Sequence, residues 1–246
     1  MVQTRQELIH IAHEGAQRGE ANMHRDLELL SLVESQTLRL AFRTYTWDPW
    51  ALSLGKHQRP DSVDETAAKD LGIDVVQRPT GGRAVLHANE LTYCIAVRHD
   101  HPRYVYAAVH EMLMAALQPL VGHRLDHETT PTDLRQHYAS STSVGQICFT
   151  SSAHSEILSG GRKIVGSAQR VFNGIILQHG SILCGPEHEG IAQLLNVSQE
   201  ERRTVVNRLR STSTSLSEIA GTAITIEHVA TAVHQVAEEV LVRKLL

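Results

Sequence analysis

The sequence predicts an α+β fold, in which a mixed or largely antiparallel sheet is flanked by helices. Apolar residues recur at helical spacing near both ends of the chain, and short alternating stretches typical of strands fill the middle. The 246 residues suit one large domain, and no internal repeat or low-complexity linker divides them. We therefore expect a single domain over 1–246, with a sheet-containing core at about 22–185 and a helical cover at about 186–246.

The first elements follow from periodicity and capping. Met23, Leu27, Leu30 and Val33 predict a helix, after which residues 38–42 alternate as a half-buried strand does. A capping box of Ser62 and Glu65, followed by Gly72, predicts a helix over 63–71. Further strands are expected at 74–78, 84–86 and 93–97.

A second set of elements begins with a helix over 103–117. The polar stretch 121–145 then predicts a long surface excursion. Short strands are expected at 147–149, 156–158, 163–165, 168–172 and 175–177, with Ser159-Gly160-Gly161 as a hairpin turn. In the tail, Ser198 with Glu201 and Ser215 with Glu218 are capping signals, and valines 229, 233, 236 and 240 share one helical face.

Composition excludes several classes of protein. A formal net charge of −4 gives no strong basic field for nucleic acid or anionic lipid, and apolar runs are too short to span a bilayer. The first twenty residues lack the apolar run of a signal peptide, so we expect a cytoplasmic protein. Three separated cysteines indicate free thiols. His123 and His127 have metal-ligand spacing, but their loop-like context favours solvated side chains, and no metal site is expected.

Two segments stand out as candidate chemistry. Adjacent glycines in Arg78-Pro79-Thr80-Gly81-Gly82-Arg83 would let backbone amides approach a ligand closely, although a plain two-glycine turn explains the same pattern. Lys163 follows Cys148 by fifteen residues, and its ammonium is expected to favour the thiolate if the two meet in the fold. A buried inert cysteine is the alternative. His87 and His179 each lie beside a glycine-rich turn, although a polar side chain whose hydrogen bonds are satisfied within the fold explains either histidine without a ligand.

Several segments, in this order, resemble the biotin/lipoate A/B protein ligase family. They are Trp47 to Gln58, Arg78 to His87, Glu90 to Tyr93, Cys148-Phe149, Gly161 to Gln169 and Gln178 to Leu183, with a weaker match at Asn22 to Asp26. The resemblance covers about residues 22–185. It implies a fold like the class II synthetase and biotinyl-lipoyl protein ligase catalytic domains.

Within this family, Arg83 and the Cys148-Phe149 pair are similar to the cysteine-dependent octanoyltransferases. That branch moves an octanoyl group from octanoyl-acyl carrier protein to a lysine of a lipoyl-domain protein, such as glycine cleavage H protein. The resemblance implies that Cys148 forms a thioester acyl-enzyme beside Lys163, without ATP or another cofactor. Ala88 and Cys94 depart from the family pattern, which usually has aspartate and serine there.

The resemblance also implies substrate-binding residues: Arg78, Gly81, Gly82, Arg83, His87, Gly166, Ser167 and His179. An apolar tunnel is expected for the acyl chain, with Val85, Ile95 and Val165 as candidate walls. We expect a monomer that binds neither nucleic acid nor membrane. Two other functions stay open on this scaffold: an ATP-dependent lipoate ligase or a lipoyl-domain amidotransferase, and a noncatalytic module that binds acyl or lipoyl proteins.

Overall fold

The computed structural model describes residues 8–127, 147–150 and 156–246 of the 246-residue chain. Its strands are β1 (Ile9–Gln17), β2 (Leu40–Trp47), β3 (Ala51–Leu54), β4 (Asp74–Gln77), β5 (Val85–His87), β6 (Glu90–Arg98), β7 (Asp126–His127), β8 (Ile157–Ser159), β9 (Arg162–Phe172) and β10 (Ile175–Leu183). Its α-helices are α1 (Gly19–Glu34), α2 (Glu65–Asp70), α3 (Pro102–Leu117), α5 (Gln199–Thr212), α6 (Leu216–Ala220) and α7 (Ile226–Leu245). Its 3-10 helices are η2 (Pro60–Ser62), η3 (Gln118–Leu120), η5 (Cys148–Thr150) and η6 (Glu187–Leu194).

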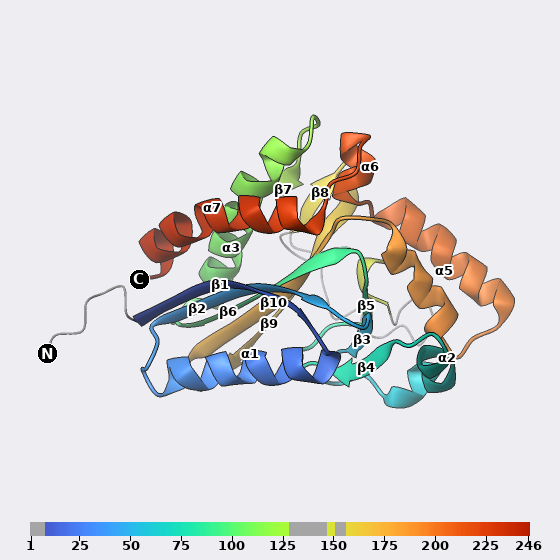
Figure 1. Ribbon diagram of the computed structural model, residues 1–246, viewed down its shortest axis with the longest axis horizontal. Helices are drawn as coiled ribbons and strands as arrows, with labels where there is room; N and C mark the ends of the chain where they lie inside the picture. Colours follow the sequence, from blue (N-terminus) through green and yellow to red (C-terminus); the bar gives the residue numbers. More distant parts are fainter. Residues whose placement is uncertain (1–7, 128–146, 151–155) are drawn as a thin grey trace, which may run out of the picture.

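A seven-stranded mixed sheet forms the centre of the fold. Its strand order is β1-β2-β6-β10-β9-β8-β7, in which β1 and β2 are parallel and the other neighbours are antiparallel. Helix α1 covers one face of this sheet, and α3 and α7 cover the other (Figure 1). This arrangement confirms the predicted α+β class.

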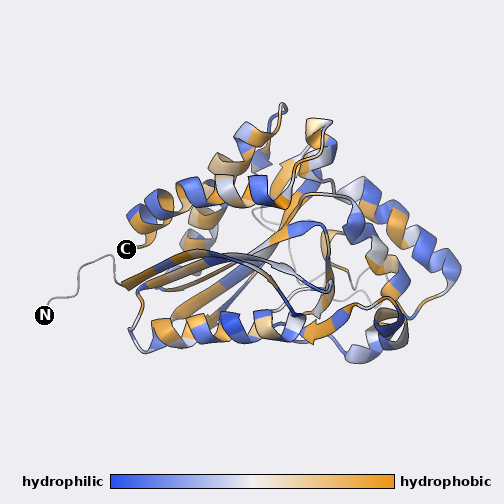
Figure 2. Cartoon of the chain, in the orientation of Figure 1, coloured by the Kyte–Doolittle hydropathy of each residue, from blue (hydrophilic) through white to orange (hydrophobic). Residues whose placement is uncertain are grey.

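The sequence of β6 explains why both faces of the sheet are covered. Leu91, Tyr93 and Ile95 alternate with Cys94 and Ala96, so period-two geometry sends the two sets to opposite faces. The first set joins the apolar core beneath α3 and α7, and the second joins the core beneath α1. Figure 2 shows hydrophobic residues along these strands, whereas the covering helices carry both hydrophobic and hydrophilic residues.

A smaller sheet stands beside the first, with strand order β4-β3-β5. Strands β3 and β4 are parallel, and β3 and β5 are antiparallel. Its apolar side packs with residues of η6 and α5, and Ile147 and Phe149 belong to the same buried cluster. The small sheet therefore holds the short segment that carries Cys148.

Several expected elements are confirmed with small shifts of their ends. Helix α3 matches the prediction over 103–117, and Ser198 with Glu201 forms the capping box that begins α5. Gly160 and Gly161, at φ +56° and +74°, form the two-residue turn between β8 and β9. Left-handed φ at both positions is what a tight hairpin of this kind requires. The tail contains α5, α6 and α7, as expected.

Three expectations at element ends are wrong. Asp64, rather than Ser62, caps α2, because its side chain accepts a hydrogen bond from the Ala67 amide at 2.9 Å. The expected strand at 147–149 is a single β-bridge at Ile147 followed by the turn of η5. The expected strands at 163–165 and 168–172 are one strand, β9, because the glycine between them stays extended and paired.

The sequence reasoning also missed elements. Strand β1 pairs with β2, so the large sheet begins before residue 22, and β3 was not foreseen. Of the expected excursion at 121–145, residues 121–127 contain buried Leu125 and the short strand β7; the remainder lies outside the described residues. Among the helices described, none has the length and apolar character needed to cross a membrane.

Candidate active site

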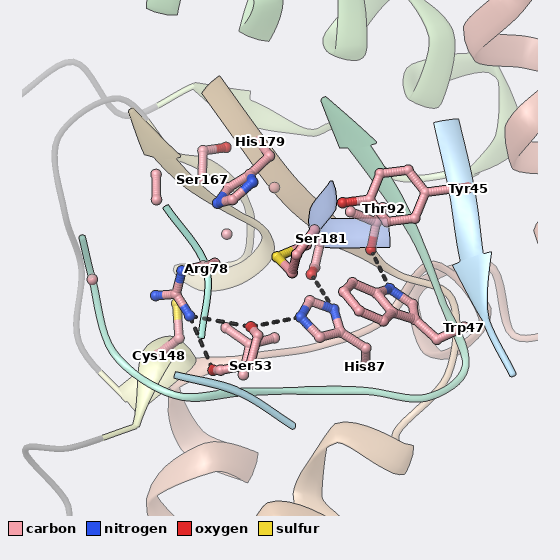
Figure 3. Close-up of a pocket in the computed structure, with 16 residues that line it drawn as sticks. Tyr45, Trp47, Ser53, Arg78, His87, Thr92, Cys148, Ser167, His179 and Ser181 are labelled. Carbon is pink, nitrogen blue, oxygen red and sulfur yellow. Dashed lines mark hydrogen bonds between the residues drawn. The ribbon is translucent and has the colours of Figure 1, made fainter. Parts of the chain in front are cut away.

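A pocket of about 430 Å³, a volume that includes open solvent, lies where the two sheets meet. Figure 3 shows its labelled side chains converging from both sheets, the loop after β4 and η5. The lining is mainly apolar, with a few polar groups. Its residues are Met23, Tyr45, Trp47, Ser53, Arg78, Gly82, Val85, His87, Thr92, Cys148, Gly166, Ser167, Ala168, His179, Gly180 and Ser181.

Cys148 is the partly exposed thiol of this pocket, whereas Cys94 and Cys184 are buried. Burial raises the pKa of the Cys94 thiol well above its usual value and raises that of Cys184 to about 12. Thiols with such high pKa values are inert near neutral pH, because the thiolate is the reactive form. Of the three cysteines, Cys148 is therefore the candidate nucleophile.

The turn that carries Cys148 is held from below by Phe149. The Phe149 ring lies against the backbone of Gly166, where an added Cβ would come within 2.9 Å of the ring. The Phe149 carbonyl oxygen accepts a hydrogen bond of 2.7 Å from the Thr212 hydroxyl at the end of α5. Because residue 166 has no side chain, the Phe149 ring packs directly against the backbone of β9. This contact and the Thr212 hydrogen bond hold the turn in place.

Lys163 does not line the pocket. Its side chain is buried and forms an ion pair with buried Glu156. Its ammonium lies 5.3 Å from the ring centroid of Phe149, the residue next to Cys148. The structure therefore brings Lys163 into the neighbourhood of the cysteine turn, with Glu156 as its charge partner.

Arg78 organises the glycine loop, which we define as residues 78–84. Its guanidinium donates to the carbonyl oxygens of Ser53, Gly81 and Arg83 at 2.7–3.2 Å. Gly82, at φ +94°, passes so close that an added Cβ would lie 2.7 Å from the Arg78 Nη2. Arg78 thus acts as a fixed support for the loop that forms one wall of the pocket.

His87 also belongs to a network of hydrogen bonds beside the pocket (Figure 3). Its Nδ1 donates to the buried carboxylate of Glu90 at 3.0 Å, and its Nε2 is 2.8 Å from the Ser53 hydroxyl. That hydroxyl also accepts a hydrogen bond of 3.2 Å from the Arg78 guanidinium, so it lies between the arginine and the imidazole. The indole of Trp47 stacks on the imidazole with a centroid distance of 4.1 Å. These contacts fix the ring plane and the tautomer.

His179 is held by Asp26 of α1. Its Nδ1 lies 3.2 Å from the Asp26 carboxylate, which also forms a 2.7 Å ion pair with fully buried Arg43. Burial acts to raise the pKa of Asp26, but the His179 hydrogen bond and the Arg43 charge keep it below its usual value. Burial lowers the pKa of His179 despite the nearby carboxylate, so the imidazole is neutral near pH 7.

The structure gathers seven of the ten sequence-predicted site residues around the pocket: Arg78, Gly82, His87, Cys148, Gly166, Ser167 and His179. Gly81, Arg83 and Lys163 do not line it. Among the expected tunnel walls, Val85 lines the pocket, whereas Ile95 and Val165 are fully buried in the core of the large sheet. That expectation was wrong for both, because β6 and β9 turn these side chains toward α3 and α7.

Sequence reasoning missed pocket residues on α1, β2 and β3, among them Met23, Tyr45, Trp47 and Ser53. One signal was present. The face of α1 that should be apolar carries fully buried Asn22 and Asp26, while Leu27 is 39% exposed. Buried polar residues on the inner side of a helix indicate a polar partner beneath it.

Solved structures with a similar fold are lipoate-protein ligases. A bipartite lipoate protein ligase from Thermoplasma acidophilum matches 94% of this chain and 83% of its own, with a TM-score of 0.69 and 18% identity. A lipoate-protein ligase A bound with ATP matches 95% of this chain and 84% of its own, with a TM-score of 0.68 and 18% identity. The fold is therefore that of the lipoate-protein ligase catalytic domains.

The sequence comparisons define the family. The model of the lipoyl protein ligase A/B catalytic domain matches residues 18–238, and the chain belongs to this family. Octanoyltransferase LipM of Kyrpidia tusciae is 34% identical over 89% of this chain and 82% of its own. Octanoyltransferase LipM of Lysinibacillus sphaericus is 32% identical over 86% of this chain and 79% of its own.

Proposed function

We propose that this protein is an octanoyltransferase of protein lipoylation, and that it works through an acyl thioester on Cys148. The observation that carries this proposal is the position of the thiol: Cys148 is the cysteine that lines a largely apolar pocket, while the other two are buried. The family membership and the relatives named octanoyltransferase support the same reaction.

The first half-reaction loads the enzyme. The Cys148 thiolate attacks the carbonyl carbon of an octanoyl thioester, the carbon–sulfur bond of the donor breaks, and the carrier leaves as its thiolate. Backbone amides of the glycine loop, or of Gly166 and Ser167, are the candidate donors to the oxyanion. Exchange of one thioester for another is nearly balanced in energy, so no nucleotide is needed.

The second half-reaction transfers the chain to a lysine. The amine form of the acceptor attacks the thioester carbon, the bond to Cys148 breaks, and the amide forms as the amine passes its proton to the departing Cys148 thiolate. We assign Lys163 a supporting role, in which its positive charge near Phe149 favours the departing thiolate. The negative charge of Glu156 partly cancels the charge of Lys163. Lys163 is therefore expected to stabilise the thiolate less than an isolated ammonium would.

The apolar part of the pocket accommodates the acyl chain. Burying six methylenes at about 0.8 kcal/mol each contributes about 5 kcal/mol of binding. Val85, Met23 and Ala168 supply apolar surface there. We further infer that the donor is octanoyl-acyl carrier protein and that the acceptor is a lipoyl-domain protein, such as glycine cleavage H protein. Free buried thiols fit a reducing, cytoplasmic setting.

The test is octanoyl transfer to a lipoyl domain from an octanoyl carrier thioester in nucleotide-free buffer. Wild-type protein and Cys184→Ala should both give product, and Cys148→Ser should give none. An ATP-dependent ligase would need nucleotide and free acid, and it would retain activity in Cys148→Ser. Product formed from a lipoyl-domain donor, but not from the carrier thioester, would instead identify an amidotransferase.

A further inference from the structure

A buried chain of hydrogen bonds connects α1 to the glycine loop through His179, one of the two histidines that line the pocket. The Asp26 carboxylate contacts His179 Nδ1 at 3.2 Å, and His179 Nε2 contacts the Thr80 hydroxyl. Asp26 and Thr80 are fully buried, and His179 is 5% exposed. The three residues come from α1, the loop after β4, and β10, so the chain joins parts of the fold that are distant in sequence.

The direction of each hydrogen bond follows from the carboxylate. Asp26 accepts from the Arg43 guanidinium and from the Tyr45 hydroxyl at 3.1 Å, which keeps it ionised. An ionised carboxylate only accepts, so His179 must carry its hydrogen on Nδ1. The Nε2 atom is then an acceptor, and the Thr80 hydroxyl donates to it. Asp26 thus selects the tautomer of His179, and the tautomer sets the orientation of Thr80.

Thr80 in turn fixes the middle of the glycine loop. Its carbonyl oxygen accepts a hydrogen bond of 2.8 Å from the Lys56 amide, so this residue is held through both backbone and side chain. Gly82, two residues later, lines the pocket. Arg78 donates hydrogen bonds to two carbonyl oxygens of the same loop, those of Gly81 and Arg83. The loop is therefore preorganised by two independent sets of contacts.

We propose that Asp26 and Thr80 are positioning residues that, through His179, hold the glycine loop in the shape that receives the acyl donor. Neither residue lines the reacting end of the pocket, so each acts through its neighbours. The inference rests on the proposed octanoyl transfer for its kinetic consequence. A neutral His179 fits this role, because only the neutral ring can accept from Thr80 while donating to Asp26.

The kinetic test uses Thr80→Val, which removes the hydroxyl and keeps the shape, and Thr80→Ser, which restores the hydroxyl. The second-order rate of Cys148 acylation by octanoyl-pantetheine is measured by intact mass. We expect Thr80→Val to lower it about tenfold or more, since displacement of a positioned group by about an ångström costs that much, and Thr80→Ser to recover most of the loss.

A matched control and a second measurement separate this role from general destabilisation. Thr44→Val removes another fully buried threonine hydroxyl, which bonds His13 and His234 outside the pocket, and should leave acylation unchanged. Iodoacetamide should alkylate Cys148 at similar rates in all variants, because this small reagent tolerates a small displacement of the thiol that the larger acyl donor does not. Nitrogen-15 spectra at neutral pH should show the Nδ1–H tautomer of His179, assigned with His179→Gln, and Asp26→Asn should shift it to Nε2–H.

The outcomes are distinguishable. Wild-type acylation in Thr80→Val, no recovery in Thr80→Ser, or an Nε2–H tautomer in the wild-type protein would each overturn the positioning role. A wild-type protein that is never acylated would instead refute the proposed function, and the nitrogen-15 measurement would still test the Asp26–His179 contact, because it needs no substrate. If Asp26→Asn fails to fold, the threonine variants and the wild-type spectrum decide the question.

Discussion

The amide of Cys148 donates a hydrogen bond of 2.9 Å to the carbonyl oxygen of Ala84, and the adjacent Ile147 forms a β-bridge with the same residue. Ala84 is the last residue of the glycine loop. The candidate nucleophile and the loop that lines its pocket are thus joined through the backbone. A change in loop shape is therefore expected to alter the position of the thiol.

The two loop glycines should differ sharply when replaced by alanine. Gly82 has φ +94° and an added Cβ would lie 2.7 Å from the Arg78 guanidinium, so Gly82→Ala should cost about 1–2 kcal/mol of unfolding free energy or more and slow acylation. Gly81 has open space around its missing Cβ, and Gly81→Ala should fold normally. Denaturation and acylation of the two variants compare them directly. Equal behaviour would refute the described loop geometry.

Replacement of Gly166 should disturb the cysteine turn from beneath. Gly166→Ala places a methyl group 2.9 Å from the Phe149 ring, and overpacking of this kind costs about 1–3 kcal/mol. The ring and the neighbouring Cys148 must then move, so acylation should fall together with stability. The double variant Gly166→Ala/Phe149→Leu should recover part of both losses. A double variant that shows the simple sum of the two single effects would contradict this packing.

Chain-length selection should depend on Ala168, a pocket residue on β9. Ala168→Leu fills apolar space, so the variant should prefer hexanoyl over octanoyl donors, by about fourfold for each methylene excluded. Competition between the two thioesters, read by mass, measures the preference. Val171→Leu, at a 48% exposed position of the same strand, is the control. An unchanged preference in Ala168→Leu would remove Ala168 from the acyl site.

Acid should destabilise the protein below about pH 6.5. Burial lowers the folded-state pKa values of His179, His188 and His234 from the usual 6.5. Between pH 6.5 and the lowered folded pKa values, the unfolded chain binds protons that the folded protein does not, so the unfolding free energy falls as the pH falls across that interval. Each group contributes up to about 1.4 kcal/mol per pH unit.

Urea denaturation at about pH 7.5 and about pH 5.5 tests this dependence. We expect a lower midpoint at the acidic pH, and a smaller difference between the two midpoints in His234→Gln. The Asp26 contribution has the same sign, but its lowered pKa places its loss in stronger acid. Identical midpoints at both values of pH would show that these histidines titrate normally in the folded protein.

Much of the fold was predictable because local patterns agreed with the tertiary structure. The double glycine of the β8–β9 hairpin and the capping box of α5 act within a few residues, and both are found as expected. The break expected within β9 is absent because Gly166 stays extended and pairs with the distant residue Ser181 of β10. Such a tertiary contact leaves no local signal in the sequence.

Site residues that lie in sequence motifs could be predicted. Residues whose position depends on long-range packing could not. Arg78, His87, Cys148 and His179 stood in recognisable segments and line the pocket. The role of Asp26 required knowing that α1 packs over β10, and the burial of Lys163 beside Glu156 required the pairing of β8 with β9. Long-range packing thus determines which charged residues reach the pocket.

The most direct test of the central claim is the intact mass of freshly reduced protein after mixing with octanoyl-acyl carrier protein, without nucleotide. We predict a mass increase of one octanoyl group, located on Cys148 by peptide mapping, and its disappearance when a lipoyl domain is added as octanoylated product accumulates. Product that accumulates while Cys148 remains unmodified, or an adduct located on Cys94 or Cys184, would contradict the account.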